Sequence, residues 1–213
     1  MEPGTYAQVA GSTPAIPTTD RETAELRCRT WTLLATLLRE TPDAGVLERL
    51  AAVDAGDADS GDPLAAAWAG LRAAARRADP EPLDDEFHDL FIGLGRGELV
   101  PYGSWYRTGF LMDRPLVALR RDLQTLGFQR QETVCEPEDH AAALAEVMAM
   151  LADPQTGQDD STQRLFFREH VDSWMPTLFA DMQAARSADF YRAVGRLGEA
   201  FLDFERAWLQ AAD

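Results

Sequence analysis

The chain has 213 residues, enough to bury a helical core without disulfide support, and its 36 acidic and 20 basic side chains give a formal net charge of −16. This charge opposes binding to nucleic acid or to an anionic membrane surface and favours a cationic partner, although solubility or a salty cytoplasm is an alternative explanation. The longest uncharged apolar stretch, Thr30 to Leu38, is far shorter than the roughly 20 residues that cross a bilayer. Cys28 and Cys135 lie far apart and outside any metal-ligand spacing, so we expect a cytoplasmic protein that is not itself exported.

The N-terminal part of the sequence predicts a leader followed by two helices. Residues 1–19 are rich in Ala, Thr, Pro and Gly and lack the apolar core of a signal peptide, so we expect a disordered leader. A first helix is predicted for residues 20–40, behind a Thr19-x-x-Glu22 capping box. Its apolar positions recur at three- and four-residue spacing, at Leu26, Thr30, Leu33, Leu34, Leu37 and Leu38. Thr41-Pro42 then offers an N-cap and an N1 proline to the second helix.

Two further helices begin at proline signals. Asp62-Pro63 opens a third helix, which carries a single apolar stripe. A fourth helix follows Pro80 and ends at Gly93, where a cluster of glycines interrupts the pattern. An irregular stretch that includes residues 101–104 is predicted next.

A change in pattern follows the next helix. Asp113 opens this helix and Gly127 closes it. The helical pattern lapses over residues 128–136, where we place a hinge. Glu136-Pro137 then gives the signal for the start of another helix.

The remainder of the chain is also predicted to be helical. Two amphipathic segments meet at Pro176, and a last helix covers residues 189–210. No convincing run of alternating apolar and polar residues occurs, so no strand is predicted and the fold class is all-α. We expect two helical subdomains, residues 20–127 and 137–213, joined by the hinge.

The densest group of polar side chains lies around the predicted hinge. Glu132, Glu136, Glu138 and Asp139 supply four carboxylates and His140 an imidazole, with no basic residue among them. Such a group is a candidate for binding a cation. The alternative is structural, because carboxylates in the first turn of a helix interact favourably with the positive end of its dipole.

A catalytic or metal-binding role at the same place is a further alternative. Cys135, Asp139 and His140 are residue types that ligate zinc or iron or that act in nucleophilic catalysis. Their spacing is unspecific, and no third group that would orient His140 is identifiable. A small helical metalloenzyme or hydrolase centred on these residues is therefore the runner-up hypothesis.

Aromatic and apolar residues gather around the irregular stretch. Large rings at helical spacing usually belong to a core, whereas rings in a loop that contains glycine and proline more often line a groove. Both interpretations stay open for these residues, which are Phe87, Leu90, Phe91, Pro101, Tyr102, Trp105 and Tyr106.

Three motifs in order resemble a known family. They are the string Phe87, Leu90 and Phe91, then Pro101-Tyr102-x-Ser104-x-Tyr106, then Glu136-Pro137-Glu138-Asp139-His140. From about residue 20 to residue 209, the sequence is similar to the TorD, DmsD and NarJ family of redox-enzyme maturation chaperones. It departs from the family pattern at Gly103, where an acidic residue commonly precedes the serine, and in the inserted Glu138.

The resemblance implies a cytoplasmic, non-catalytic protein without a cofactor or metal of its own. Such a protein binds the twin-arginine signal peptide and the apo form of a molybdoenzyme's catalytic subunit, assists insertion of the molybdenum cofactor, and delays export until maturation. The implied peptide-binding residues are Phe87, Leu90, Phe91, Pro101, Tyr102, Ser104, Glu136, Asp139 and His140.

The chemistry of these residues agrees with that role. A twin-arginine leader joins two guanidinium groups to an apolar run, so its partner needs carboxylates beside a hydrophobic surface. Arginine prefers bidentate carboxylate partners, which Asp139 and Glu136 supply. A cytoplasmic adaptor that uses the same surface for another peptide is the remaining alternative.

Overall fold

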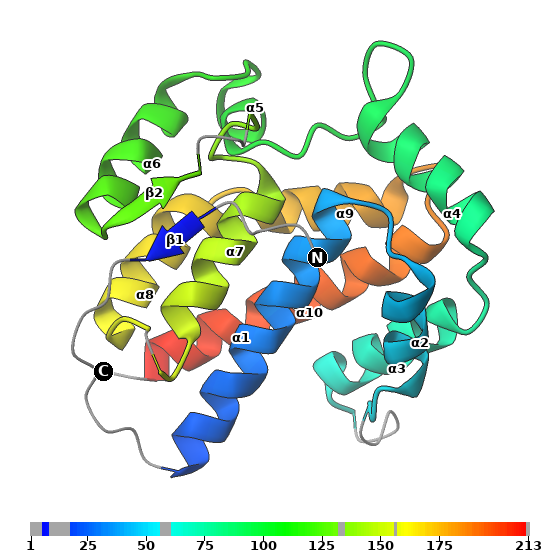
Figure 1. The fold of residues 1–213 in the computed structure, drawn as a ribbon, viewed down its shortest axis with the longest axis horizontal. Coiled ribbons are helices and arrows are strands. Elements are labelled where there is room, and N and C mark those ends of the chain that lie inside the picture. Colours follow the sequence, from blue (N-terminus) through cyan, green and yellow to red (C-terminus); the bar gives the residue numbers. More distant parts are fainter. Residues whose placement is uncertain (1–5, 9–17, 56–60, 132–134, 156, 212–213) are drawn as a thin grey trace. The chain divides into compact units, whose positions relative to one another are not determined.

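The chain packs as two compact units, each assembled from segments that are far apart in the sequence. The structure is a computed structural model, and it describes residues 6–8, 18–55, 61–131, 135–155 and 157–211 (Figure 1). Unit 1 contains the described residues of Met1–Thr36, Tyr102–Trp174 and Leu209–Asp213. Unit 2 contains those of Leu37–Pro101 and Met175–Trp208. The division into subdomains 20–127 and 137–213, with a hinge at 128–136 between them, stays a prediction.

Unit 1 is organised around helix α7 (Ala141–Ala152), which has ten buried residues among its twelve. A helix that is apolar on all sides belongs inside a core, and the six alanines of α7 let other elements approach it closely. It contacts β1, α8 and the π-helix η2. The other elements of the unit are β1 (Tyr6–Gln8), most of α1 (Thr18–Arg39), α5 (Gly103–Thr108), α6 (Arg114–Thr125), β2 (Phe128–Arg130), α8 (Asp160–Phe166) and η2 (Phe167–Val171).

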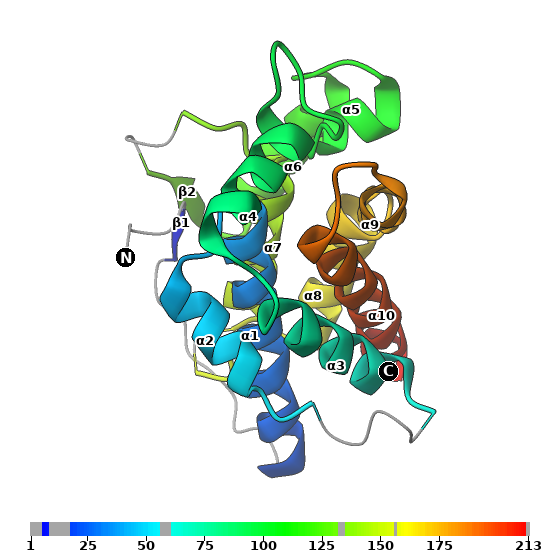
Figure 2. The same ribbon diagram turned by 90° about the vertical axis from the view of Figure 1, so that its right-hand side faces the viewer.

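The regular elements of unit 2 are all helices in the described residues. It contains α2 (Ala44–Ala52), α3 (Pro63–Ala75), α4 (Pro80–Phe87), the π-helix η1 (His88–Ile92), α9 (Met175–Ala184) and most of α10 (Phe190–Ala211). Helices α2 and α3 lie side by side in both views (Figures 1 and 2). A Cβ atom at Gly198 of α10 would lie 2.4 Å from the ring of Phe179 on α9, so the absence of a side chain there permits their close packing.

The all-α class is confirmed, although two short strands were not predicted. Strands β1 and β2 pair antiparallel, with Tyr6 opposite Arg130 and Gln8 opposite Phe128. Three residues are too few to show an alternating pattern, so these strands left no signal in the sequence. The predicted disordered leader, residues 1–19, lies outside the described residues except for β1 and the start of α1.

Several helix boundaries follow the predicted signals. The side chain of Asp62 caps α3 by accepting the amide hydrogen of Leu64 at 3.0 Å, as expected. Gly93 ends η1 with a φ angle of 60°, and a Cβ atom there would lie 2.3 Å from the carbonyl oxygen of Arg96. None of the described helices combines the length with the apolar character that a membrane crossing requires.

Three boundary predictions were wrong. Helix α2 is capped by Asp43, whose carboxylate accepts the amide hydrogen of Val46 at 2.7 Å, whereas Thr41 donates its hydroxyl to Asp84. The stretch at 101–104 is not wholly irregular, because α5 begins at Gly103. Helix α7 begins at Ala141 and not at the Glu136-Pro137 signal.

Candidate peptide-binding site

Two of the predicted motifs meet in unit 1. The backbone of Tyr102 pairs with that of His140 in an antiparallel bridge, and the amide of Gly103 donates to the carbonyl of Asp139 at 2.9 Å. The rings of Tyr102 and His140 lie 5.0 Å apart in an edge-to-face arrangement. Segments 102–104 and 139–140 thus form one local structure, although Ser104 and Asp139 are 35 residues apart in sequence.

Asp139 is an internal anchor of this structure. Its side chain is only 3% exposed, and Oδ2 accepts the amide hydrogen of Ser104 at 2.7 Å. Together with the bond between its carbonyl and Gly103, this contact satisfies two amides in the first turn of α5. Its other oxygen, Oδ1, is buried and accepts no hydrogen bond from the described part of the chain. Asp139 is therefore buried in this arrangement, and its side chain stabilises the start of α5.

The acids of this motif do not lie in the first turn of a helix, so the dipole interpretation given above is wrong. His140 is the N-cap of α7, and its Nδ1 accepts the amide hydrogen of Ala142 at 3.2 Å. This bond requires an unprotonated Nδ1, so it fixes the Nε2–H tautomer of a neutral ring. The acids precede the helix in a turn, and each has its own environment. Glu132 lies outside the described residues.

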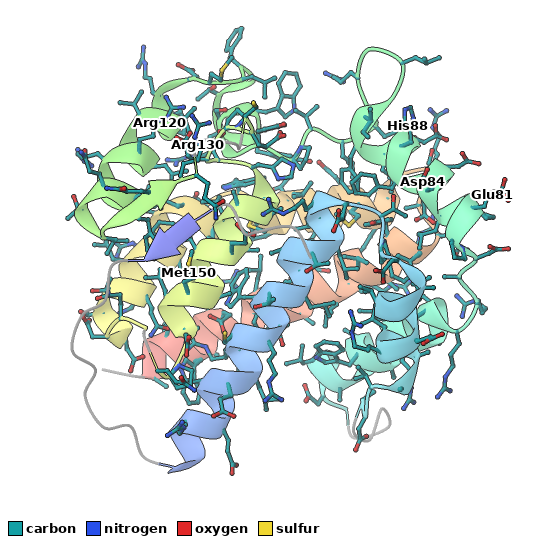
Figure 3. All side chains as sticks on the ribbon, viewed as in Figure 1. Glu81, Asp84, His88, Arg120, Arg130 and Met150 are labelled. Carbon is teal, nitrogen blue, oxygen red and sulfur yellow. The ribbon has the colours of Figure 1, made fainter. Side chains whose placement is uncertain are left out.

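Glu138 is buried among basic side chains. Its carboxylate lies 2.8 Å from Nη2 of Arg120 on α6 and 3.7 Å from Nε of Arg130 on β2 (Figure 3). Burial by itself raises the pKa of the Glu138 carboxyl, but the hydrogen bond from Arg120 and the charges of Arg120 and Arg130 outweigh it and hold the pKa below its usual value. Glu138 is thus compensated internally.

Glu136 is the exposed carboxylate of the motif. It accepts a hydrogen bond from the hydroxyl of Tyr102, and Arg130 donates to its backbone carbonyl at 3.2 Å. Burial raises the pKa of Tyr102, and the bond to the Glu136 carboxylate together with its charge raises it further, so the phenol stays protonated and keeps donating. Among the described acids of this motif, Glu136 therefore presents the accessible carboxylate, and Tyr102 orients it.

Ser104 and Gly103 have structural surroundings. Ser104 is fully buried, and its Oγ accepts the amide hydrogen of Met112 at 3.1 Å. A Cβ atom at Gly103 would lie 3.1 Å from Nε1 of Trp174, so a side chain at this position would press on that indole. The peptide-binding role assigned to Ser104 stays a prediction, and in this structure it acts by holding the loop after α5.

The apolar string at 87–91 belongs to unit 2, whereas Tyr102, Ser104 and residues 136–140 belong to unit 1. Phe87 is 8% exposed and Leu90 is fully buried, while Phe91 is partly exposed. The ring of Tyr191 lies 5.8 Å from Phe87 and 5.4 Å from Phe91, so these rings form an aromatic core cluster. The core interpretation fits Phe87 and Leu90. Pro101 is also buried, at the end of the same unit.

The rings beside the second motif are more accessible. Tyr102, Trp105 and Tyr106 are each partly exposed, and the ring of Tyr106 lies 5.4 Å from that of Trp174. The loop that follows them was not predicted to be part of a site. Its exposed apolar side chains are Phe110 (70%), Leu111 (49%) and Met112 (69%), with Val117 (67%) on the adjoining helix α6. Three consecutive apolar residues directly after Gly109 could have indicated this exposed loop in the sequence.

The metalloenzyme alternative has no ligand set in the described part of the chain. No group of three or more His, Cys, Asp or Glu side chains converges there on a point where a metal ion would bind. Cys135 is exposed, whereas Asp139 is buried with one oxygen on Ser104 and His140 uses Nδ1 as a helix cap.

Comparison with known proteins identifies the family. The family model described as nitrate reductase delta subunit matches residues 57–180, which is more than half of the chain. The chain belongs to the TorD, DmsD and NarJ family of redox-enzyme maturation chaperones.

Individual relatives agree with this assignment. The chaperone protein TorD of Vibrio cholerae is 28% identical over 130 residues, which are 57% of this chain and 59% of that protein. The Tat proofreading chaperone DmsD of Salmonella typhi is 30% identical over 135 residues, 62% of this chain and 65% of that protein. The chain thus matches less than two thirds of the length of these relatives.

A solved structure shares the fold. The crystal structure of a proposed redox enzyme maturation protein from Archaeoglobus fulgidus superposes with a TM-score of 0.54 at 16% identity, over 90% of this chain and 98% of that one. At this identity, the similarity supports the fold alone.

Proposed function

We propose that this protein is a cytoplasmic, non-catalytic chaperone for the catalytic subunit of a molybdopterin-dependent oxidoreductase. It binds the subunit's twin-arginine signal peptide and its apo form, assists insertion of the molybdenum cofactor, and delays export until the cofactor is in place. The protein holds no cofactor of its own in this role. The names of the relatives, chaperone protein TorD and Tat proofreading chaperone DmsD, support the proposal at the level of the family.

One observation carries the proposal. The exposed carboxylate of Glu136 and the ring of Tyr102 are joined by a hydrogen bond, at a surface whose backbone is fixed by Asp139. A guanidinium needs such an oriented carboxylate, and it also stacks favourably on an aromatic ring. The loop 110–112, held by Ser104, adds the apolar side chains that an uncharged leader segment requires.

The division of labour among the acids follows from their burial. Glu136 is the carboxylate that an arginine reaches directly, because Glu138 is engaged by Arg120 and Asp139 is buried under α5. Asp139 and Ser104 are positioning residues, and Tyr102 both orients Glu136 and offers its own ring face.

Calorimetry with two synthetic leader peptides tests the function. One peptide carries the arginine pair, and in the other both arginines are replaced by glutamine. Binding of the first is expected to weaken with ionic strength, because exposed charge pairs are screened. Glu136→Gln is expected to weaken it about threefold to tenfold, as for a largely exposed charge-assisted contact.

The control is Glu22→Gln, which removes the same charge from an exposed position of unit 1. Equal affinity of the wild-type protein for both leaders at every salt concentration would refute the arginine contact. Binding of unrelated peptides with the same affinity would instead favour the adaptor hypothesis.

A further inference from the structure

Glu86 on α4 joins its helix to the start of α10. Its Oε1 accepts the amide hydrogens of Asp189 and Tyr191, each at 2.8 Å, and its Oε2 accepts that of Phe190 at 3.1 Å. Amides in the first turn of a helix have no partner within that helix, and a carboxylate there also meets the positive end of the dipole. A single side chain thus satisfies the first two amides of α10 and the amide of Asp189 just before it, all more than 100 residues away in sequence.

Glu98, which follows η1, makes a second link to the segment just before α10. Its Oε1 lies 3.2 Å from Nε of Arg186, and its Oε2 accepts the amide hydrogen of Ser187 at 3.2 Å. The backbone bond from Ser187 is the main cause of the lowered pKa of the Glu98 carboxyl, which therefore stays ionised and keeps accepting. One carboxylate precedes η1 and the other follows it, and both bind the segment 186–191.

Between these two links lies the apolar string of the family motif. Phe87, Leu90 and Phe91 pack in unit 2, with the rings of Phe87 and Phe91 5.0 Å apart and both against Tyr191. Residues 88–92 form a π-helix, a rare conformation that occurs mostly as single turns within α-helices and frequently at functional sites. As the structure stands, Leu90 offers no surface to a ligand and Phe87 almost none.

A hollow of about 430 Å³ lies beside Glu86. Asp85, Asp89 and Asp189 line it together with Arg77, so the charges around it are mixed. Asp189 and Phe190 also line it, so the start of α10 borders open space beside its contact with Glu86.

We propose that Glu86 and Glu98 form a two-point strap that closes η1 onto the segment 186–191. When the strap opens, the apolar face of Phe87, Leu90 and Phe91 becomes a second apolar surface, in addition to the loop 110–112, for the uncharged segment of a signal peptide. The inference rests on the proposed function, because it gives those motif residues their peptide-binding role. A ligand that binds the open state alone shifts the population toward it, and its apparent affinity is reduced by the rarity of that state.

Hydrogen exchange on the full-length protein without peptide tests the closure itself. Glu86→Gln and Glu98→Gln are compared with Glu81→Gln, which removes the same charge from an exposed position on α4 (Figure 3). The strap variants are expected to exchange the amides of 189–191 and 88–92 about tenfold faster than the wild type, as for the loss of a charge-assisted bond. They should also bind more of an apolar fluorescent dye. Glu81→Gln should change neither, and unchanged exchange and dye binding in both strap variants would overturn the inference.

Peptide affinity tests the link to function. A leader whose arginines are replaced by glutamine is expected to bind Glu86→Gln several times more tightly than wild type, and the gain should vanish in Glu86→Gln combined with Phe91→Ala. Faster exchange without any gain in affinity would reduce Glu86 to a helix cap and overturn the regulatory role. If the wild-type protein binds no leader at all, the proposed function fails and the peptide-binding half of the inference fails with it. Hydrogen exchange and dye binding then test only whether Glu86 and Glu98 hold η1 closed. Far-UV circular dichroism shows whether each variant is folded.

Discussion

The imidazole of His170 on η2 is held by the carboxylate of Asp122 on α6, with 2.9 Å between Nε2 and Oδ2. His170 is 6% exposed, and its burial lowers the pKa of the ring, an effect that the hydrogen bond to Asp122 only partly offsets. The ring is therefore neutral near neutral pH and donates its Nε2 hydrogen to Asp122. Both residues lie in unit 1, so the pair joins two of its helical elements.

A dependence of stability on pH follows from this pair. Because the pKa of His170 in the folded state lies below the unfolded value of 6.5, the unfolded chain takes up a proton first, and stability falls as the pH drops below about 6.5 toward the folded pKa. In urea unfolding at pH 7 and pH 5.5, His170→Gln is expected to lose part of this dependence, since its amide still donates to Asp122 but does not titrate. His88→Gln, at an exposed histidine, should retain the wild-type dependence. An identical dependence in all three proteins would contradict the assignment.

Asp139→Asn separates positioning from direct contact. The substitution is expected to cost about 1–2 kcal/mol of stability, because the carboxylate that caps α5 is replaced by a weaker acceptor. If Asp139 acts through α5, the substitution should weaken the binding of both leaders, with and without the arginine pair, by the same factor. A double-mutant cycle in calorimetry measures this, and a coupling energy above about 1 kcal/mol with the arginines would instead place Asp139 in direct contact with them.

Gly103→Ala and Gly70→Ala form a matched pair. The new methyl group at Gly103 would press on the indole of Trp174, whose Nε1 donates to the carbonyl of His170 at 2.7 Å. We expect a loss of about 1–3 kcal/mol, as in other overpacked sites. At Gly70, inside α3, no atom lies within 4 Å of the added carbon, so the same change should stabilise the protein by about 0.5–1 kcal/mol. Thermal unfolding measures both, and a stabilised Gly103→Ala would show that the contact with Trp174 relaxes freely.

Met112→Gly tests the conformation of the exposed loop. Met112 has a φ angle of 56°, in a region that costs a residue with a side chain on the order of 1 kcal/mol. Its side chain is 69% exposed, so glycine loses little packing and is expected to raise the stability by several tenths of a kcal/mol. Met112→Ala keeps the unfavourable angle and should show no gain. If both variants lose stability equally, then packing by the methionine side chain is the dominant effect.

The helices could be predicted because their determinants are local. Asp62 and Gly93 work through residues close to them in sequence, so a capping signal and a stop signal sufficed. The start of α7 was misplaced because Glu136-Pro137 carries the usual signal for a helix start, while His140, a less common cap, takes that position.

The site was predictable only in outline. The motifs named the right segments, but burial decides what each residue can do, and burial depends on partners elsewhere in the chain. Asp139 was expected to bind an arginine of the leader. In the structure its carboxylate instead accepts the amide hydrogen of Ser104, which lies 35 residues away in sequence. The role of Glu86 could not be predicted from the sequence, because its three partners follow more than 100 residues later.

The capping of α10 by Glu86 also constrains the order in which the protein assembles during synthesis. The carboxylate leaves the ribosome long before residues 189–191, so α4 must wait for most of the chain before it gains these partners. Unit 2 as a whole has the same property, because Leu37–Pro101 packs with Met175–Trp208 while the segment between them belongs to unit 1. Until Tyr191 is synthesised, the partly made protein lacks the ring that packs against Phe87 and Phe91, and exposed apolar rings of this kind favour aggregation.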